Sequence, residues 1–237
     1  MNVIFVTVKN GDFFSSENYS VFKQSLSHLE KNDKIVILNS TLIKIEKLEI
    51  DNSYEILDVT PLDCDLNVYG AVLNYLRLFE NSPIEYVMML SSENIFFTRN
   101  PFDYFKYFKK NIYFYSMSTV DRESVANRIN YGNFVKTCNY YVGDDFNTLS
   151  IGEYLYAADY NTFKSLVLFL FLNVNRNSAA HIYIKSIFSY AYKNLCTLYK
   201  VSLLDTNFIK KYSSLSAINN VVNDSIESKK QYVLLLE

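Results

Sequence analysis

The sequence has few residues that break or cross-link a chain: its 237 residues include 5 Gly, 3 Pro and 3 Cys, and Trp is absent. The cysteines, Cys64, Cys138 and Cys196, are far apart and odd in number. They indicate neither a disulfide framework nor a cysteine-based zinc cluster, and a reducing compartment suits them. The composition is globular, with 49% hydrophobic and 20% charged residues.

The sequence also lacks a long hydrophobic run. The longest uninterrupted one, 166–172, is far shorter than the ~20 residues of a membrane-spanning helix. The N-terminus, MNVIFVTVKN, is interrupted by Lys9 too soon for a signal peptide. We therefore expect a cytoplasmic protein without a transmembrane segment, and peripheral association with a membrane stays open.

Charge of one sign does not accumulate either. There are 23 Lys and Arg against 25 Asp and Glu, a net charge of −2, with no long basic run. A nucleic-acid surface needs clustered cations for phosphate contacts, so nucleic acid is excluded as a partner.

Short apolar runs alternate with helical patterns over the first ~120 residues, which is typical of a parallel sheet flanked by helices. Strands are expected at 3–8, 34–38, 54–59, 86–90 and 112–117, and helices at 16–29, 65–80 and 101–110. The second half is less regular: it predicts strands at 134–142 and 197–204, helices at 159–171 and 179–195, a polar peripheral stretch at 213–230 and an added edge strand at 232–236. Without a repeat or a linker, the chain reads as one α/β domain spanning 1–237.

Polar residues stand where several of these strands end. Thr7 and Asp58 end the first and third strands, and Ser91-Ser92-Glu93 follows the fourth. Ligands of such sheets lie beyond the carboxyl ends of the strands, so these residues are candidate ligand contacts.

The order of these pieces resembles the GT-A class of sugar-nucleotide-dependent glycosyltransferases. The strand at 3–7 is similar to the family's first strand, and the helix at 65–80 to its lead-in helix. Residues 86–101 look like the family's hydrophobic strand, D-x-D motif, hydrophobic pair and Asn-Pro turn, and 150–156 like its acceptor-side strand. The resemblance implies a mostly parallel, Rossmann-like central sheet, with a nucleotide-binding half at 1–118, an acceptor-side half at 119–210 and a peripheral tail at 211–237.

The chain departs from the family's pattern at three places. The D-x-D position holds Ser91-Ser92-Glu93, so the motif is degenerate, with a single carboxylate. The late helix carries Ser178-Ala179-Ala180-His181 where the family often has an acidic residue and glutamine, and Ser150 replaces the usual asparagine.

The resemblance implies a role for each candidate residue. Glu93 would bind a divalent metal, Mn²⁺ or Mg²⁺, that arrives with the donor, because such ions accept one or two protein carboxylates plus phosphate oxygens. Glu153 or His181 would take the proton of the acceptor hydroxyl. The remaining assignments are Thr7, Asp58, Arg77, Ser91 and Ser92 at the nucleotide and donor, and Ser150 and Gly152 in the acceptor pocket.

Each of these residues also has a structural alternative. Ser91-Ser92 can be a strand-end turn with Glu93 solvated, and Asp58 can be a turn residue. Arg77 can be a surface cation, Glu153 an outward strand residue and His181 a polar helix residue. His28 is expected on the surface. The intact D-x-D at 63–65 precedes a helix rather than following an apolar strand, so Asp65 is better explained as a helix cap.

The predicted function is a hexosyltransferase-like enzyme that moves a sugar from a nucleotide-sugar donor, of the UDP-sugar class by resemblance, to a hydroxyl of a glycan, lipid or protein. One alternative is a GT-A-shaped binding or scaffold protein without catalysis, which the degenerate motif favours. The other is an unrelated α/β nucleotide-binding protein.

Overall fold

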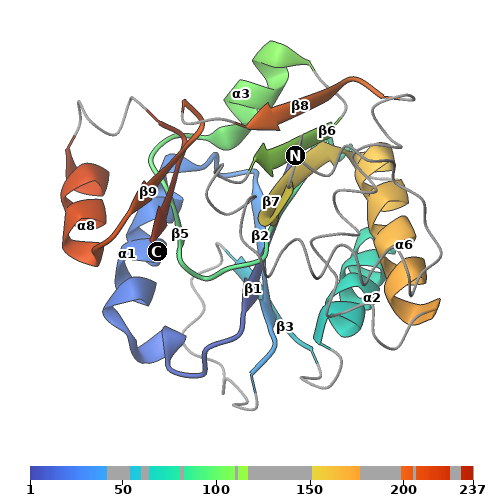
Figure 1. Cartoon of the computed structure of the whole chain (residues 1–237), viewed down its shortest axis with the longest axis horizontal. Coiled ribbons are helices and arrows are strands. Elements are labelled where there is room, and N and C mark those ends of the chain that lie inside the picture. The colour runs from blue at the N-terminus through green and yellow to red at the C-terminus, as the bar shows by residue number, and fades with distance from the viewer. Residues whose placement is uncertain are drawn as a thin grey trace, which may run out of the picture.

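The computed structural model contains a seven-stranded central sheet with a smaller three-stranded sheet beside it (Figure 1). It describes residues 1–41, 54–59, 64–80, 83–109, 112–116, 151–176, 199–204, 207–224 and 231–236, with the backbone alone at 64–66, 116, 151–154 and 173–176. The predicted strand at 134–142 and helix at 179–195 lie outside the described residues.

The central sheet is mostly parallel, as predicted. Its order is β3-β2-β1-β4-β7-β6-β8, and β7 alone runs against its two neighbours. The strands are β1 (Val3–Val8), β2 (Lys34–Asn39), β3 (Tyr54–Asp58), β4 (Tyr86–Leu90), β6 (Ile112–Ser116), β7 (Ile151–Asp159) and β8 (Val201–Leu204). All residues of β1 and β4 are buried, because helices or the second sheet cover both faces of the central sheet.

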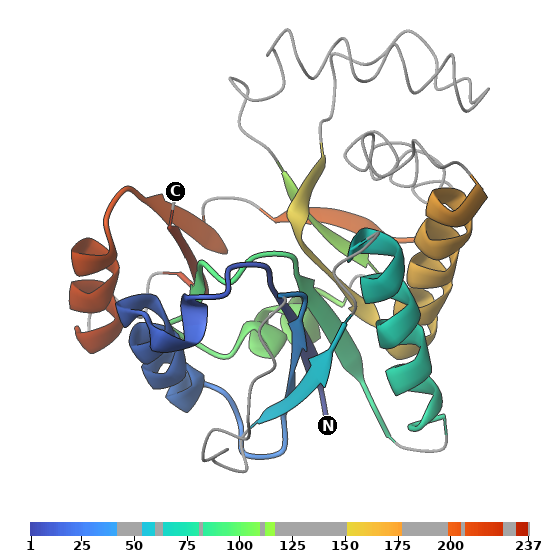
Figure 2. The ribbon, with the colours of Figure 1, turned by 90° about the horizontal axis from the view of Figure 1, so that it is seen from below.

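Two cores lie on opposite faces of the sheet. One face packs against α2 (Cys64–Arg77) and α6 (Tyr160–Arg176), which lie side by side in Figures 1 and 2. The other face packs against α1 (Glu17–Ser25), the short 3₁₀ turns η1 (Phe13–Ser15) and η2 (Leu26–His28), α3 (Pro101–Phe108) and the small sheet. Alternate residues of β1 supply the two cores: Val3 and Phe5 face α2, whereas Ile4 and Val6 face the other side.

Capping side chains fix where several helices begin. Ser16 Oγ accepts a hydrogen bond from Tyr19 N, and Asn100 Oδ1 accepts one from Phe102 N at 2.9 Å, as predicted for the Asn-Pro turn. Asp159 Oδ1 accepts one from Thr162 N at 3.1 Å at the start of α6. At α2, however, the helix already includes Cys64, so Asp65 lies inside its first turn rather than at a cap.

The C-terminal region differs from the prediction. The last strand, β10 (Val233–Leu236), is the central strand of the small sheet, between β5 (Ile95–Phe97) and β9 (Ile209–Tyr212), and not an added edge. The predicted polar stretch contains α8 (Leu215–Asn223), whose Ile218 and Val222 are buried beside α1.

His28 is also placed differently from its predicted surface position. It is partly buried and bonds to the backbone of Val222 in α8. Burial lowers the pKa of His28, because the charged imidazolium loses hydration there.

Candidate functional site

Glu93 lies at the carboxyl edge of the central sheet, beside the end of β1. The parallel pairing of β1 with β4 places Val6 level with Leu90. The chain continues beyond both strands, and Lys9 N donates to Glu93 Oε2 at 3.4 Å. Glu93 is partly exposed and Lys9 is exposed, so both residues lie side by side at these strand ends and reach solvent.

The residues around Glu93 form an ordered turn. Ser92 Oγ accepts a hydrogen bond from Asn94 N at 3.1 Å, which is the strand-end role named as the alternative for this serine. Asn94 connects the turn to α1 and β10. Its Oδ1 accepts a hydrogen bond from Asn18 Nδ2 at 3.1 Å, and its backbone O accepts one from Leu236 N at 3.0 Å. The turn thus has one fixed conformation relative to α1 and β10.

Asp58 ends β3 at the same edge and bonds to a residue that the sequence reasoning missed. Asn39, at the level end of β2, donates from Nδ2 to Asp58 Oδ1 at 2.7 Å. Thr41 Oγ1 in turn donates to Asn39 Oδ1 at 2.8 Å. Asp58 is exposed and Asn39 buried, so the amide orients the carboxylate while leaving it open to solvent. The parallel alignment of β2 and β3 is the signal that could have found Asn39.

Thr7 lies one residue before the end of β1 and is 1% exposed. Its Oγ1 is buried, and no group that the structure describes hydrogen-bonds to it. A buried hydroxyl without a partner lowers the stability of a fold, and Thr7 carries such a hydroxyl near the predicted edge. Its enclosed hydroxyl does not face solvent in this conformation.

Arg77 is not brought to this edge. It is the last residue of α2, and α2 runs back from the carboxyl end of β3 toward the start of β4. Tyr160 directly follows β7, and its hydroxyl donates to the backbone O of Leu76, the residue before Arg77, at 2.8 Å. The backbone N of Tyr160 donates to the O of Glu85, just before β4. Arg77 is thus at the amino edge, about 20 Å of helix from the predicted phosphate position. Arg77 is an exposed cation at the end of α2, apart from the other candidate residues, and its contact with the phosphate stays a prediction.

The backbone of the acceptor-side residues does reach the carboxyl edge. Leu155 of β7 pairs with Leu90, and Gly152 pairs with Tyr115, so Gly152 and Glu153 extend past the end of β4. The side chain of Glu153 is not described. Ser150 and His181 lie outside the described residues, and the catalytic roles of Glu153 and His181 stay predictions.

The described residues at this edge offer a metal ion a single carboxylate at the D-x-D position. Among the described residues, no three His, Cys, Asp or Glu side chains are gathered closely enough to hold one. At the D-x-D position Ser91 and Ser92 are neutral, and Glu93 already accepts a hydrogen bond from Lys9. An ion of the Mn²⁺ or Mg²⁺ type would find one carboxylate here, so Glu93 as a metal ligand stays a prediction.

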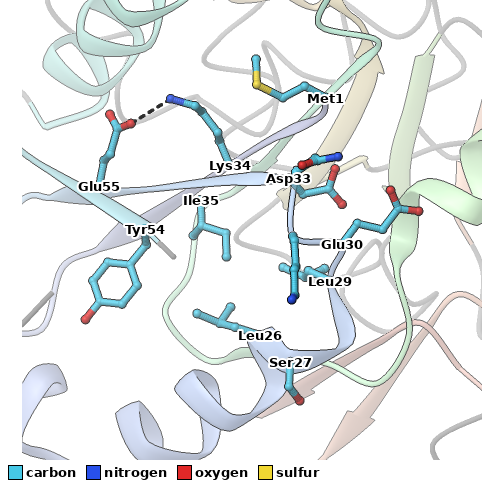
Figure 3. Close-up of a pocket in the computed structure, with 12 residues that line it drawn as sticks. Met1, Leu26, Ser27, Leu29, Glu30, Asp33, Lys34, Ile35, Tyr54 and Glu55 are labelled. Carbon is cyan, nitrogen blue, oxygen red and sulfur yellow. Dashed lines mark hydrogen bonds and ion pairs between the residues drawn. The ribbon is translucent and has the colours of Figure 1, made fainter. Parts of the chain in front are cut away.

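A cavity of about 720 Å³ lies at the opposite, amino edge of the sheet (Figure 3). Its lining combines apolar side chains such as Leu26 and Ile35 with charged ones. Two of these charges pair with each other, because Lys34 Nζ lies 3.1 Å from Glu55 Oε1, and the Tyr75 hydroxyl also donates to Glu55 Oε2. Ligands of parallel sheets bind at the carboxyl edge, so we do not assign the candidate site to this cavity.

The structure was compared with known proteins. No family model and no curated protein sequence matches the chain. Among solved structures, it is similar to the galactosyltransferase LgtC in complex with donor and acceptor sugar analogs, with a TM-score of 0.55 and 10% sequence identity. The alignment covers 100% of this chain and 87% of that one.

The chain has a GT-A-like fold. The mostly parallel sheet agrees with the fold expected from the sequence, and the acceptor-side strand is followed by a helix as expected; the reversed direction of β7 was not predicted. At this identity the likeness concerns the fold alone. None of the described helices is both long and apolar enough to cross a bilayer.

Proposed function

We propose that the protein is a glycosyltransferase that moves a sugar from a nucleotide-sugar donor, of the UDP-sugar class, to an acceptor hydroxyl. One observation carries the proposal: a GT-A-like sheet brings Glu93, Lys9 and the Asn39–Asp58 pair to its carboxyl edge. This is the edge where open α/β sheets bind nucleotides.

The two ends of this edge suit the two parts of a donor. Asp58 is exposed and oriented by Asn39, so its carboxylate can accept hydrogen bonds from a ribose or a base. Ser91 and Glu93 follow β4, where the diphosphate would lie, and Thr7 ends the strand between these two positions.

The transfer needs a base and a stabilised leaving group. The acceptor oxygen attacks the anomeric carbon of the sugar and its proton passes to a base, for which Glu153 and His181 are our candidates. The bond between the sugar carbon and the phosphate oxygen breaks, and its electron pair stays on the nucleoside diphosphate. Charge gathering on that diphosphate must be stabilised by groups at the carboxyl edge.

A second candidate is a GT-A-like binding protein without catalysis. The observation that favours it is the turn at 91–94, where Ser92 Oγ accepts a hydrogen bond from Asn94 N and Asn94 Oδ1 accepts one from Asn18 Nδ2. A residue committed to holding a turn is not available for catalysis.

Calorimetry with UDP, GDP and their sugars, paired with an assay for released sugar, distinguishes these candidates. The enzyme should bind one nucleotide class and release sugar slowly, and Asp58→Ala should weaken binding about tenfold. The matched control is Asp12→Ala, which removes another exposed carboxylate and should leave affinity unchanged. Binding without sugar release identifies the scaffold protein. No response to any nucleotide would refute both candidates.

A further inference from the structure

The turn after β4 offers a divalent ion only one carboxylate, that of Glu93. A divalent ion at a diphosphate is usually held by one or two carboxylates, and two neutral serines stand beside the single carboxylate here. The neighbouring strand end contributes a cation instead. Lys9 is exposed and its backbone N lies 3.4 Å from Glu93 Oε2.

An ammonium group can do the electrostatic work of a metal ion at a leaving phosphate. Lysine binds phosphate oxygens as a compact charge on a flexible stem, so a bound diphosphate need not lie at one fixed distance from its backbone. Val6 pairs with Leu90, and Lys9 and Glu93 each follow three residues later, beyond the ends of both strands. The contact between Lys9 N and Glu93 Oε2 brings Lys9 beside the degenerate motif.

We propose that Lys9 supplies the positive charge that stabilises the departing nucleoside diphosphate, in place of a resident divalent ion. This inference rests on the proposed function. As the bond between the sugar carbon and the phosphate oxygen breaks, the electron pair stays on that oxygen, and the Lys9 ammonium donates a hydrogen bond to the diphosphate. Lys9 also interacts within the chain, and a bound diphosphate would add to that interaction or replace it.

Glu93 then has a positioning role rather than a metal-binding one. Its carboxylate accepts the hydrogen bond from Lys9 N and so holds the segment after β1 against the turn after β4. A glutamine can accept the same bond through its amide oxygen, but it is a poor ligand for Mn²⁺ or Mg²⁺. The Glu93→Gln variant therefore separates the two roles.

The test is calorimetry with UDP and with uridine, each in excess EDTA and in Mn²⁺, on wild type and on Lys9→Ala, Lys9→Arg and Glu93→Gln. For wild type we expect UDP affinity to differ less than threefold between EDTA and Mn²⁺. Lys9→Ala should weaken UDP binding about 10- to 100-fold and leave uridine binding within twofold, because a charged hydrogen bond to the diphosphate is lost. Lys9→Arg should recover most of the loss, and Glu93→Gln should stay within threefold of wild type.

The opposite pattern overturns the inference: UDP binding that EDTA abolishes and Glu93→Gln removes, with Lys9→Ala within twofold of wild type. In that case uridine and UDP still bind and the proposed function stands. A wild type that binds neither UDP nor uridine overturns the proposed function and this inference together. Lys9 is exposed, so Lys9→Ala should unfold at the same denaturant concentration as wild type, which checks that the fold is intact.

Discussion

The described polar residues at the two edges of the central sheet have different roles. At the amino edge, Asp33 is buried and accepts hydrogen bonds from Asn2 N, Asn2 Nδ2 and Asn100 Nδ2. At the carboxyl edge, the hydrogen bond described for Glu93 is a long one from Lys9 N. Polar groups that satisfy one another stabilise a fold, whereas polar groups left open can bind a ligand.

This difference also explains why the cavity at the amino edge need not be the site. The cavity at the amino edge is lined by Lys34 and Glu55, which pair with each other. The close-up in Figure 3 shows the side chains of this pair pointing toward one another from the neighbouring strands β2 and β3. A ligand there would have to compete with bonds that the protein already makes, so we assign structural roles to this edge.

The largest effect should come from Asp33. Asp33→Ala leaves the buried amides of Asn2 and Asn100 without their acceptor and should lower the free energy of unfolding by about 3 kcal/mol. Urea denaturation measures this loss, and Asp12→Ala is the exposed control, expected to change it by less than about 0.5 kcal/mol. A loss below about 1 kcal/mol for Asp33→Ala would show that the amino edge is not held together by this network.

Thr7 gives the next largest effect, with the opposite sign. Thr7→Val removes a buried hydroxyl that has no partner among the described residues and should raise the free energy of unfolding by about 1 kcal/mol. Thr98→Val is a matched control, because the buried Thr98 Oγ1 donates to Gln231 O at 2.8 Å and its loss should cost about 1 kcal/mol. If Thr7→Val destabilises the protein instead, Thr7 belongs with the satisfied groups, and the contrast between the edges weakens.

Lys34 tests the assignment of the site directly. Lys34→Ala breaks a largely exposed ion pair with Glu55, so we expect a loss of stability of about 0.5 kcal/mol and UDP affinity within twofold of wild type. Calorimetry in the same buffer as the Lys9 series measures both edges on one scale. A fivefold loss of affinity in Lys34→Ala would move the candidate site to the cavity at the amino edge.

The elements that were predicted correctly are those whose sequence pattern extends over a few neighbouring residues. The buried runs of β1, β2 and β4 and the Asn100 cap are readable because hydrophobicity and capping act over a few residues. The position of β10 between β5 and β9 was missed, since short apolar strands far apart in the chain carry no signal for which strand pairs with which. Network partners such as Asn2 and Asp33, 31 residues apart, are hidden for the same reason.

The candidate site follows the same division. Strand ends placed Asp58 and Glu93 at one edge, because all carboxyl ends of parallel strands meet there. Arg77 was assigned to the phosphate because it is near β4 in sequence, but helix α2 places it at the amino edge, apart from the other candidates. Lys9 was unnoticed as a site residue, since only the pairing of β1 with β4 brings it beside Glu93.

The smallest effect concerns the pH dependence of the packing near the amino edge. Burial lowers the pKa of His28 below its ordinary value of about 6.5, so the native state binds a proton less readily than the unfolded chain. The stability that neutral His28 provides is therefore fully present above about pH 6.5 and is lost as the pH falls through the lowered pKa. Denaturation of wild type and His28→Gln between pH 7.5 and 5 should show wild type losing more stability toward acid. The carboxylates titrate alike in both proteins. If the free energies of unfolding of the two proteins fall in parallel with pH, the protonation of His28 does not affect stability.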